Sequence, residues 1–180
     1  MEKLVLAYRS LLEACAFAAR AHRHQLRKDG ETPYVSHAFR VCLVARDVFG
    51  IDDKQLLTAA LLHDTVEDTA TDFDDIKQAF DDEVANWVSA LSKDKRIPEA
   101  QREIAYEKQL AASPWQVKVC KLADVFDNLV DSVRMSPKQQ AKNKANARRY
   151  LKALQDGLPE AVRPAWQIVS RLLADLESTK

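Results

Sequence analysis

Apolar residues recur at three- and four-residue intervals along most of the chain, which is the spacing of one face of an α-helix. The first such segment covers about residues 4–22 and includes Leu4, Leu11, Cys15 and Ala18. Glycine occurs only three times, while residues that favour helices are abundant. The pattern therefore predicts an all-α fold. The further helices that it predicts lie at 36–49, from 52 or 53 to about 63, from 71, from 81 or 82 to about 91, from 98, from 114, at 138–155 and at 159–176.

Capping residues set several of the predicted helix boundaries. Asp52 or Asp53 can cap the third helix through its carboxylate. Thr71 and Asp74 have the spacing of a capping box in which Asp replaces Glu. Ser136-Pro137 combines a cap residue with a proline suited to a first helical turn. These positions predict separate helices joined by short loops, with no long linker between domains.

Length and composition favour one compact unit. The chain has 180 residues, enough for one substantial core but too few for a second catalytic domain of ordinary size. We expect a single domain over residues 1–180, with a motif-bearing core at about 10–135 and C-terminal helices at about 137–178. Basic and acidic residues number 27 each, so the net charge gives no sign of a nucleic-acid or membrane surface.

The cysteines and the N-terminus favour a cytoplasmic protein. Cys15, Cys42 and Cys120 lie in apolar helical patterns, are odd in number and lack CxxC spacing. We therefore predict buried, reduced thiols and no disulfide framework. The N-terminus lacks the pattern of a secretion signal, and the uncharged apolar runs are too short to span a bilayer.

The clearest candidate chemistry lies in residues 61–68, Leu-Leu-His-Asp-Thr-Val-Glu-Asp. His63 and Asp64 leave a helix about 100° apart, so both side chains can turn toward one ion. If the helix continues, Glu67 and Asp68 lie one turn further on, at the same opening. Three carboxylates and an imidazole gathered at the end of an apolar helix are costly without a cation. A lone His-Asp pair, however, is more typical of a helix end without a metal, so the neighbouring motifs decide.

Two further residues complete a candidate metal site. His37 begins an amphipathic helix, and Asp124 lies on a nearly apolar one, where an unpaired carboxylate would be costly. The alternative for Asp124 is an ion pair with Lys121, one turn back. Together the motifs predict one site with four ligands, namely His37, His63, Asp64 and Asp124. This set of nitrogen and oxygen ligands suits Mn²⁺, Fe²⁺ or Zn²⁺ and leaves coordination positions for water and substrate oxygens.

Four ordered motifs carry a family resemblance over approximately residues 10–135. They are Arg-Lys-Asp-Gly at 27–30, Pro-Tyr-Val-Ser-His at 33–37, the segment 59–69 and Lys-Leu-Ala-Asp at 121–124. In this order they resemble the HD-domain metal-dependent phosphohydrolases and, among these, the alarmone hydrolases. These (p)ppGpp 3′-pyrophosphohydrolases form the hydrolase half of RelA/SpoT-type enzymes and also occur as free-standing enzymes such as the metazoan SpoT homologue. Because the chain has no synthetase half, the resemblance implies the free-standing type.

The resemblance implies a helical bundle with a single metal site at its centre and a chemical role for each motif. The metal is typically Mn²⁺, held by two His and two Asp that match His37, His63, Asp64 and Asp124. The matching Glu-Asp pair, Glu67 and Asp68, is implicated in catalysis, because a carboxylate beside a metal-bound water can orient it or accept its proton. The alternative is that Asp68 and Thr69 cap the next turn. The implied substrates are ppGpp and pppGpp, giving GDP or GTP and pyrophosphate.

Three further residues are candidates for binding substrate. A charge pair in a loop is usually just solvated, but the match at Arg27 and Lys28 makes both candidates for contacts with phosphate oxygens. Asn128 lies one turn beyond Asp124 on the same helix face, where it could meet substrate or hydrogen-bond to the ligand behind it. The sequence leaves these two roles of Asn128 open.

The chain departs from the family pattern after Asp124, where Val125 and Val130 stand at positions that are commonly basic. Two alternatives stay open, and this departure motivates the first. One is a phosphatase acting on another phosphorylated nucleotide, such as NADPH. The other is a nucleotide-binding module without catalysis, against which the intact Glu67-Asp68 pair argues. Base specificity and oligomeric state are not determined by the sequence.

Other polar residues have less specific interpretations. For His22 and His24, a solvated or structural role is favoured. A second basic cluster is expected to form a solvent-exposed face, although it could border the pocket and hold a 5′-phosphate. It consists of Lys142, Lys144, Arg148 and Arg149.

Overall fold

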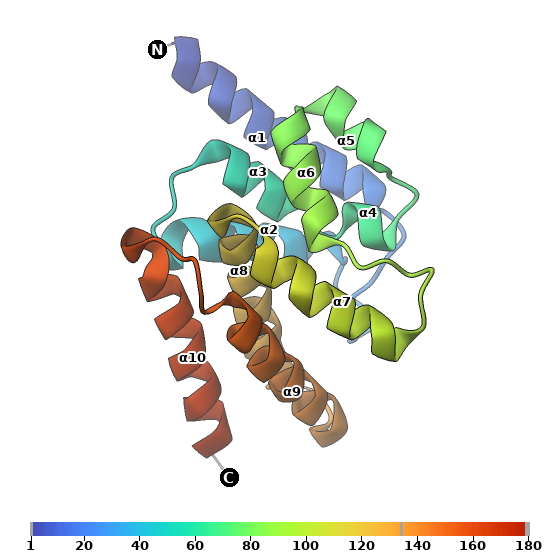
Figure 1. Ribbon diagram of the computed structural model, residues 1–180. Coiled ribbons are helices and arrows are strands. Elements are labelled where there is room, and N and C mark those ends of the chain that lie inside the picture. Colours follow the sequence, from blue (N-terminus) through green and yellow to red (C-terminus); the bar gives the residue numbers. More distant parts are fainter. Residues whose placement is uncertain (1, 134, 179–180) are drawn as a thin grey trace.

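Every regular element in residues 2–133 and 135–178, the part of the chain that the computed structural model describes, is a helix (Figure 1). Leu26 and Pro33 add one isolated β-bridge. The predicted all-α fold is thereby confirmed. The α-helices are α1 (Glu2–Ala21), α2 (Val35–Leu43), α3 (Lys54–Leu62), α4 (Thr65–Asp68), α5 (Phe73–Ala79), α6 (Asp82–Leu91), α7 (Glu99–Ala112), α8 (Trp115–Ser132), α9 (Pro137–Leu154) and α10 (Arg163–Ser178), accompanied by the π-helical segment η1 (Val44–Val48) and the 3₁₀ segment η2 (Glu160–Val162).

Helix α3 lies at the centre of the N-terminal half. It contacts α1, α2, α6 and α8, and its residues 56–62 are all buried. A helix that is apolar all round has no face for solvent and is stable only when it is packed on every side. The Asp53 carboxylate caps α3 by accepting hydrogen bonds from the backbone N–H groups of Gln55 and Leu56. The end of this buried helix therefore delivers His63 and Asp64 into the interior.

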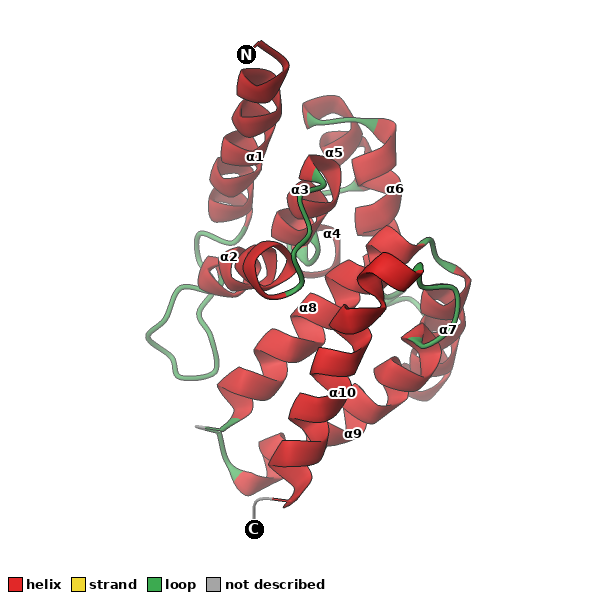
Figure 2. Ribbon diagram, turned by 90° about the vertical axis from the view of Figure 1, so that its left-hand side faces the viewer, coloured by secondary structure: helices red, strands yellow, loops and turns green. Residues whose placement is uncertain are grey.

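Helix α8 connects the two halves of the molecule. It contacts α2, α3 and α6 on one side and α9 and α10 on the other. Figure 2 shows α8, α9 and α10 as neighbouring helices below the N-terminal helices. One hydrophobic core runs through both halves, from Ala14 on α1 to Leu173 on α10. Because α8 is buried on two sides, a carboxylate on its inner face, such as that of Asp124, is removed from water.

Two predicted boundaries need correction. The segment expected as one helix at 36–49 is α2 followed by the π-helical segment η1, where the N–H of Phe49 donates to the carbonyl of Val44. The expected capping box at Thr71 lies one residue later, between Asp72 and Asp75. The Thr71 N–H is instead bound by the hydroxyl of Thr69, so Thr71 belongs to the preceding turn. The capping box at Ser136 is present, as its cap-like pattern suggested.

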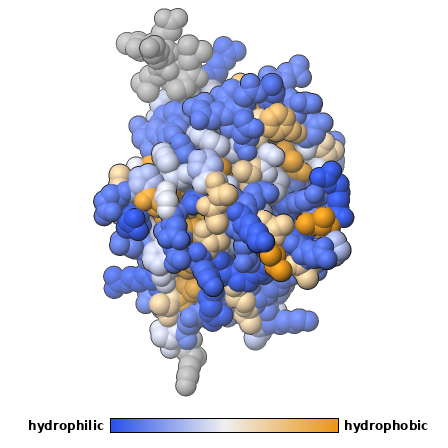
Figure 3. Space-filling view, viewed as in Figure 1, coloured by the Kyte–Doolittle hydropathy of each residue, from blue (hydrophilic) through white to orange (hydrophobic). Residues whose placement is uncertain are grey.

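One face of the molecule is mainly polar. On the face shown in Figure 3, hydrophilic residues cover most of the molecule and the hydrophobic patches are small. None of the described helices is both long and apolar enough to cross a bilayer. The three cysteines are free thiols, as expected, but only Cys120 is fully buried.

The central position of α3 can be tested by Leu56→Ala. Leu56 is completely buried, so its truncation removes buried apolar surface and leaves a cavity. We expect the free energy of unfolding, measured by urea denaturation, to fall by about 2–5 kcal/mol. Leu12→Ala is the control, since Leu12 is 68% exposed on α1 and its truncation should change stability by less than about 0.5 kcal/mol. Equal losses in the two variants would contradict this packing.

Candidate metal centre

The candidate metal centre begins at the end of α3. The helix does not continue through the motif, because His63 and Asp64 form a turn before the four-residue helix α4. The Asp64 backbone has φ −101° and ψ −3°, outside regular helix geometry. The hydroxyl of Thr65 donates to the carbonyl of Leu62 and so helps to satisfy the end of α3. The turn leaves both the imidazole and the carboxylate facing α2 and α8.

The four predicted ligands come together at this turn. His37 Nε2 lies 3.1 Å from Asp124 Oδ1 and 3.6 Å from Asp64 Oδ2. His63 Nε2 lies 3.0 Å from Asp64 Oδ2 and 3.9 Å from Asp124 Oδ1. One ligand atom each from His37, His63 and Asp124 lies within 4.8 Å of the other two. Three separate elements, α2, the turn after α3, and α8, thus deliver side chains that could hold one divalent ion.

Hydrogen bonds on the far side of each imidazole support a metal-binding role. His63 Nδ1 lies 2.8 Å from the carbonyl oxygen of Ala60, which can only accept, so Nδ1 carries the proton and Nε2 keeps its lone pair. His37 Nδ1 similarly faces Asp127 Oδ2 at 2.7 Å. His63 Nε2 is buried and has no hydrogen-bond partner among the described residues. A divalent cation at the centre of the cluster would satisfy this nitrogen, so the residues present fit a metal ion.

The two candidate carboxylate ligands are also oriented from outside. The hydroxyl of Tyr34 donates to Asp64 Oδ2. Lys121 Nζ donates to Asp124 Oδ2 at 2.6 Å, and Asn128 Nδ2 donates to Asp124 Oδ1. The ion pair with Lys121, which the sequence offered as the alternative to ligation, is therefore present. It engages Oδ2, whereas Oδ1 faces His37, so the two roles are compatible.

Burial and charge act in opposite directions on these groups. Burial opposes the charged form of Asp124, but Lys121 and the two histidines hold its pKa well below the usual range. Burial also opposes the charged form of His37, yet its contacts with Asp124 and Asp127 raise the pKa to about 9. Burial and the neighbouring Asp64 raise the pKa of Tyr34, so its hydroxyl stays a donor. The carboxylates of the centre therefore favour a bound cation between them, either a proton on an imidazole or a metal ion.

Glu67 and Asp68 lie on α4, directly after the turn. Glu67 is half-buried, and its Oε2 accepts a hydrogen bond from the backbone N–H of Lys93 at 2.9 Å. Burial, aided by the charge of Asp64, raises the pKa of Glu67. Asp68 is more exposed and forms an ion pair with Lys95 at 2.7 Å. Of the two, Glu67 has the environment of a proton acceptor.

Arg27 is held close to the centre by carboxylates on α8. Its guanidinium donates to Asp131 Oδ2 at 2.6 Å and lies 5.7 Å from the centre of the Tyr34 ring. Arg40 joins the same network by donating to both Asp127 and Asp131. Asp127, in turn, faces the imidazole of His37. The candidate substrate-binding arginine and a candidate metal ligand are therefore connected through one helix.

The candidate substrate residues line two separate cavities. Asn128 and Asp124 line one of about 180 Å³, together with Lys93, Lys121 and Tyr150. Arg27 and Lys28 line another of about 270 Å³. Both cavities are smaller than the roughly 300–1,000 Å³ of a typical ligand pocket, so each could take only part of a nucleotide.

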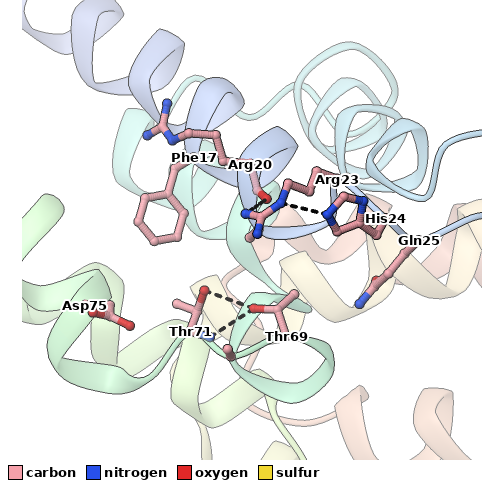
Figure 4. Close-up of a pocket in the computed structure, with 10 residues that line it drawn as sticks. Phe17, Arg20, Arg23, His24, Gln25, Thr69, Thr71 and Asp75 are labelled. Carbon is pink, nitrogen blue, oxygen red and sulfur yellow. Dashed lines mark hydrogen bonds between the residues drawn. The ribbon is translucent and has the colours of Figure 1, made fainter.

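A larger hollow, about 670 Å³, lies between the end of α1 and the segment after α4 (Figure 4). Arg23, His24, Thr69 and Thr71 are among its lining residues, and none of the predicted ligands is. Size alone therefore does not identify the centre of chemistry in this protein.

The second basic cluster, on α9, is engaged in contacts with other helices. Arg148 pairs with Glu177 at 2.6 Å, Arg149 binds Glu107, and Lys144 donates to a carbonyl on α10. On α9, Asn143, Asn146 and Tyr150 line the cavity beside Asp124 instead.

Comparison with known proteins agrees with this geometry. The family described as "HD domain" matches residues 14–156. The chain belongs to the HD-domain family. The human protein named guanosine-3′,5′-bis(diphosphate) 3′-pyrophosphohydrolase MESH1 is 44% identical over 128 residues, which cover 71% of this chain and 72% of the relative. A protein with the same enzyme name from Aquifex aeolicus is 35% identical over 136 residues, covering 72% of this chain but 19% of that protein.

A solved structure also resembles this HD domain closely. It is that of a metazoan ortholog of SpoT that hydrolyzes ppGpp and plays a role in starvation responses. The two structures superpose with a TM-score of 0.79 at 31% sequence identity, covering 90% of this chain and 94% of that one. The resemblance expected from the four sequence motifs is thus confirmed over most of the molecule.

Several residues of the HD-domain centre were missed by sequence reasoning. Tyr34 lies inside a quoted motif, but nothing in the pattern indicated that its hydroxyl reaches Asp64. Asp127 and Asp131 could have been found, because carboxylates spaced three and seven residues beyond Asp124 on a mostly apolar helix require partners. Arg27 and Arg40 provide those partners in the structure.

Removal of divalent ions should lower the thermal stability of this HD domain. An ion that binds only the folded state adds about 2.7 kcal/mol at a concentration 100-fold above its Kd. We therefore expect the thermal midpoint to fall after dialysis against EDTA and to rise again with added divalent metal. The His63→Ala variant should lose this response, while His24→Ala, which changes an exposed histidine, should keep it. A full metal response in His63→Ala would exclude the proposed centre.

Proposed function

We propose that this HD domain hydrolyses ppGpp and pppGpp, releasing the 3′-pyrophosphate and leaving GDP or GTP. The observation that carries the proposal is the pair of buried imidazoles whose Nε2 atoms face two carboxylates, in a chain 44% identical to a protein named for this reaction. In the reaction, the oxygen of water forms a bond to the phosphorus attached to the 3′ oxygen. The bond between that phosphorus and the 3′ oxygen breaks, and the nucleotide leaves.

We propose Mn²⁺ as the metal of this site. The proposed ligands are His37, His63, Asp64 and Asp124, a mixed nitrogen and oxygen set that suits this ion. When bound, the ion supplies Lewis-acid polarisation of a phosphoryl oxygen and a water of lowered pKa. Four protein ligands leave coordination positions open for substrate.

Glu67 and Asp68 are the proposed residues for handling the attacking water. The raised pKa of Glu67 supports a role as proton acceptor, because a carboxylate with higher basicity accepts a proton more readily. The hydrogen bond from the Lys93 backbone fixes Oε2 of Glu67 and leaves the other oxygen available. Asp68, held by Lys95, is proposed to assist in orienting the water.

Arg27 and Lys28 are the proposed contacts for substrate phosphates. Asp131 holds the Arg27 guanidinium in place, so less conformational freedom is lost when a phosphate binds. Asn128, proposed as a third contact, donates to Asp124 and also lines the cavity beside it. The sequence left two roles of Asn128 open, substrate binding and hydrogen bonding to Asp124. The hydrogen bond in the structure supports the second role.

The first test is hydrolysis of ppGpp by the purified protein with Mn²⁺, scored as release of GDP and pyrophosphate. Glu67→Gln should lower kcat by about 10²–10⁴-fold, because the amide cannot accept the proton but can still accept the Lys93 hydrogen bond. Mn²⁺ affinity should be retained in this variant. Glu83→Gln, an exposed change on α6, is the control. Absence of pyrophosphate release by the Mn²⁺-loaded wild type would exclude ppGpp as substrate, and NADPH would be assayed next.

The second test concerns Arg27. Arg27→Ala should raise KM for ppGpp by about 10–100-fold, the equivalent of one charge-assisted hydrogen bond of about 1.5–3 kcal/mol. Arg46→Ala is the matched control, since Arg46 is an exposed arginine that pairs with its neighbour Asp47. Unchanged KM in Arg27→Ala would restrict Arg27 to its structural contact with Asp131.

A further inference from the structure

His22 occupies an unusual position directly after α1. It is only 2% exposed, although the flanking Arg23 and His24 are exposed. Its ring lies against the ring of Tyr34 with the centroids 4.9 Å apart. Its Nδ1 lies 2.8 Å from Oε1 of Gln25. A buried histidine thus contacts two residues of the loop that leads to α2.

Each of these two neighbours reaches the proposed catalytic machinery. The hydroxyl of Tyr34 donates to Asp64, a proposed metal ligand. The side-chain amide of Gln25 donates through Nε2 to the backbone carbonyl of Asp68 at 2.5 Å, at the end of α4. Figure 4 shows Gln25 extending from the segment after α1 toward this turn. His22 therefore contacts the first residue of two connections, one to the candidate metal centre and one to the end of α4, the short helix that carries Glu67.

The backbone carbonyl of Asp68 fixes the direction of both hydrogen bonds between His22, Gln25 and Asp68. A carbonyl can only accept, so the amide nitrogen of Gln25 faces Asp68 and its oxygen faces His22. His22 Nδ1 therefore carries the proton. The α4 helix has only four residues and cannot be stable by itself, so its position depends on such contacts.

The other ring nitrogen of His22 is unfavourable for stability. Nε2 is buried and has no hydrogen-bond partner among the described residues. A buried polar atom without a partner destabilises the folded state, and an apolar side chain of similar size would avoid this cost. A residue kept only for stability would not be expected to leave a buried nitrogen unsatisfied.

We propose that His22 is a positioning residue for the hydrolysis reaction. Through Gln25 it holds the end of α4, which carries Glu67 and Asp68, and through Tyr34 it holds the carboxylate of Asp64. The expected effect of His22 on kcat rests on the proposed function, whereas its expected effect on metal binding does not depend on the substrate.

The test compares His22→Leu with His22→Asn in the full-length protein. Leucine fills the space without a donor, whereas the asparagine amide can place a donor near the position of Nδ1. For His22→Leu we expect a thermal midpoint close to wild type, a kcat for ppGpp lowered about 10–100-fold with little change in KM, and weaker binding of Mn²⁺ in calorimetric titration. His22→Asn should recover most of the kcat. His24→Leu, at the exposed neighbour, should match wild type in every measurement.

A structural role alone gives a different result. In that case His22→Leu would lower the thermal midpoint, while the kcat of the folded protein and its affinity for Mn²⁺ would stay at wild-type values. This result would overturn the inference. So would a His22→Asn variant as impaired in kcat as His22→Leu.

A second variant keeps the inference testable if His22→Leu does not fold. Gln25→Glu is nearly isosteric and half-exposed, but its carboxylate cannot donate to the Asp68 carbonyl. It should reproduce the loss of kcat, and wild-type kcat in Gln25→Glu would overturn the inference. If the wild type releases no pyrophosphate from ppGpp, the proposed function fails. Weaker Mn²⁺ binding by His22→Leu would then still support the connection to Asp64, and unchanged binding would overturn it.

Discussion

The candidate metal centre of this HD domain depends on two hydrogen bonds made by the Nδ1 atoms of His63 and His37. His63 donates to the carbonyl of Ala60, and His37 faces the carboxylate of Asp127. Each bond fixes which ring nitrogen carries the proton and turns the other toward Asp64 and Asp124. Without them the imidazoles could rotate or exchange tautomers, and the centre would lose the aligned lone pairs that a metal ion needs.

The need to orient these side chains accounts for three carboxylates on the inner side of α8. Asp124 faces the histidines, Asp127 orients one of them, and Asp131 holds Arg27. Each of these three carboxylates has a cationic or hydrogen-bonding partner, which offsets the cost of desolvating it. Helix α8 thereby contacts both the candidate metal centre, through Asp124 and Asp127, and the proposed phosphate contact Arg27, through Asp131.

Much of the fold was predictable because helix formation depends on local spacing. The apolar period located the long helices, and cap residues marked three helix starts. Ser136 is confirmed as a cap, and the structure selects Asp53 over Asp52 and Asp81 over Asp82. The errors fall where several local hydrogen-bonding patterns compete. At Val44–Val48 the backbone bonds shift to π-helical spacing, and at Thr71 a threonine-threonine contact displaces the expected cap. Such differences depend on packing and cannot be derived from the period of apolar residues.

The sequence by itself determined the helical class, the four ligand candidates and the family, because these follow from residue type, order and spacing. The tertiary structure decided which atoms of those residues face one another and which side chains hold them. Asp127, Tyr34 and His22 contribute through contacts between segments that lie far apart in the chain, as in the bond between His37 and Asp127. Spacing along one helix carries no information about such contacts. They arise only when α2, α3 and α8 pack together, since packing brings these buried polar groups within hydrogen-bond distance of one another.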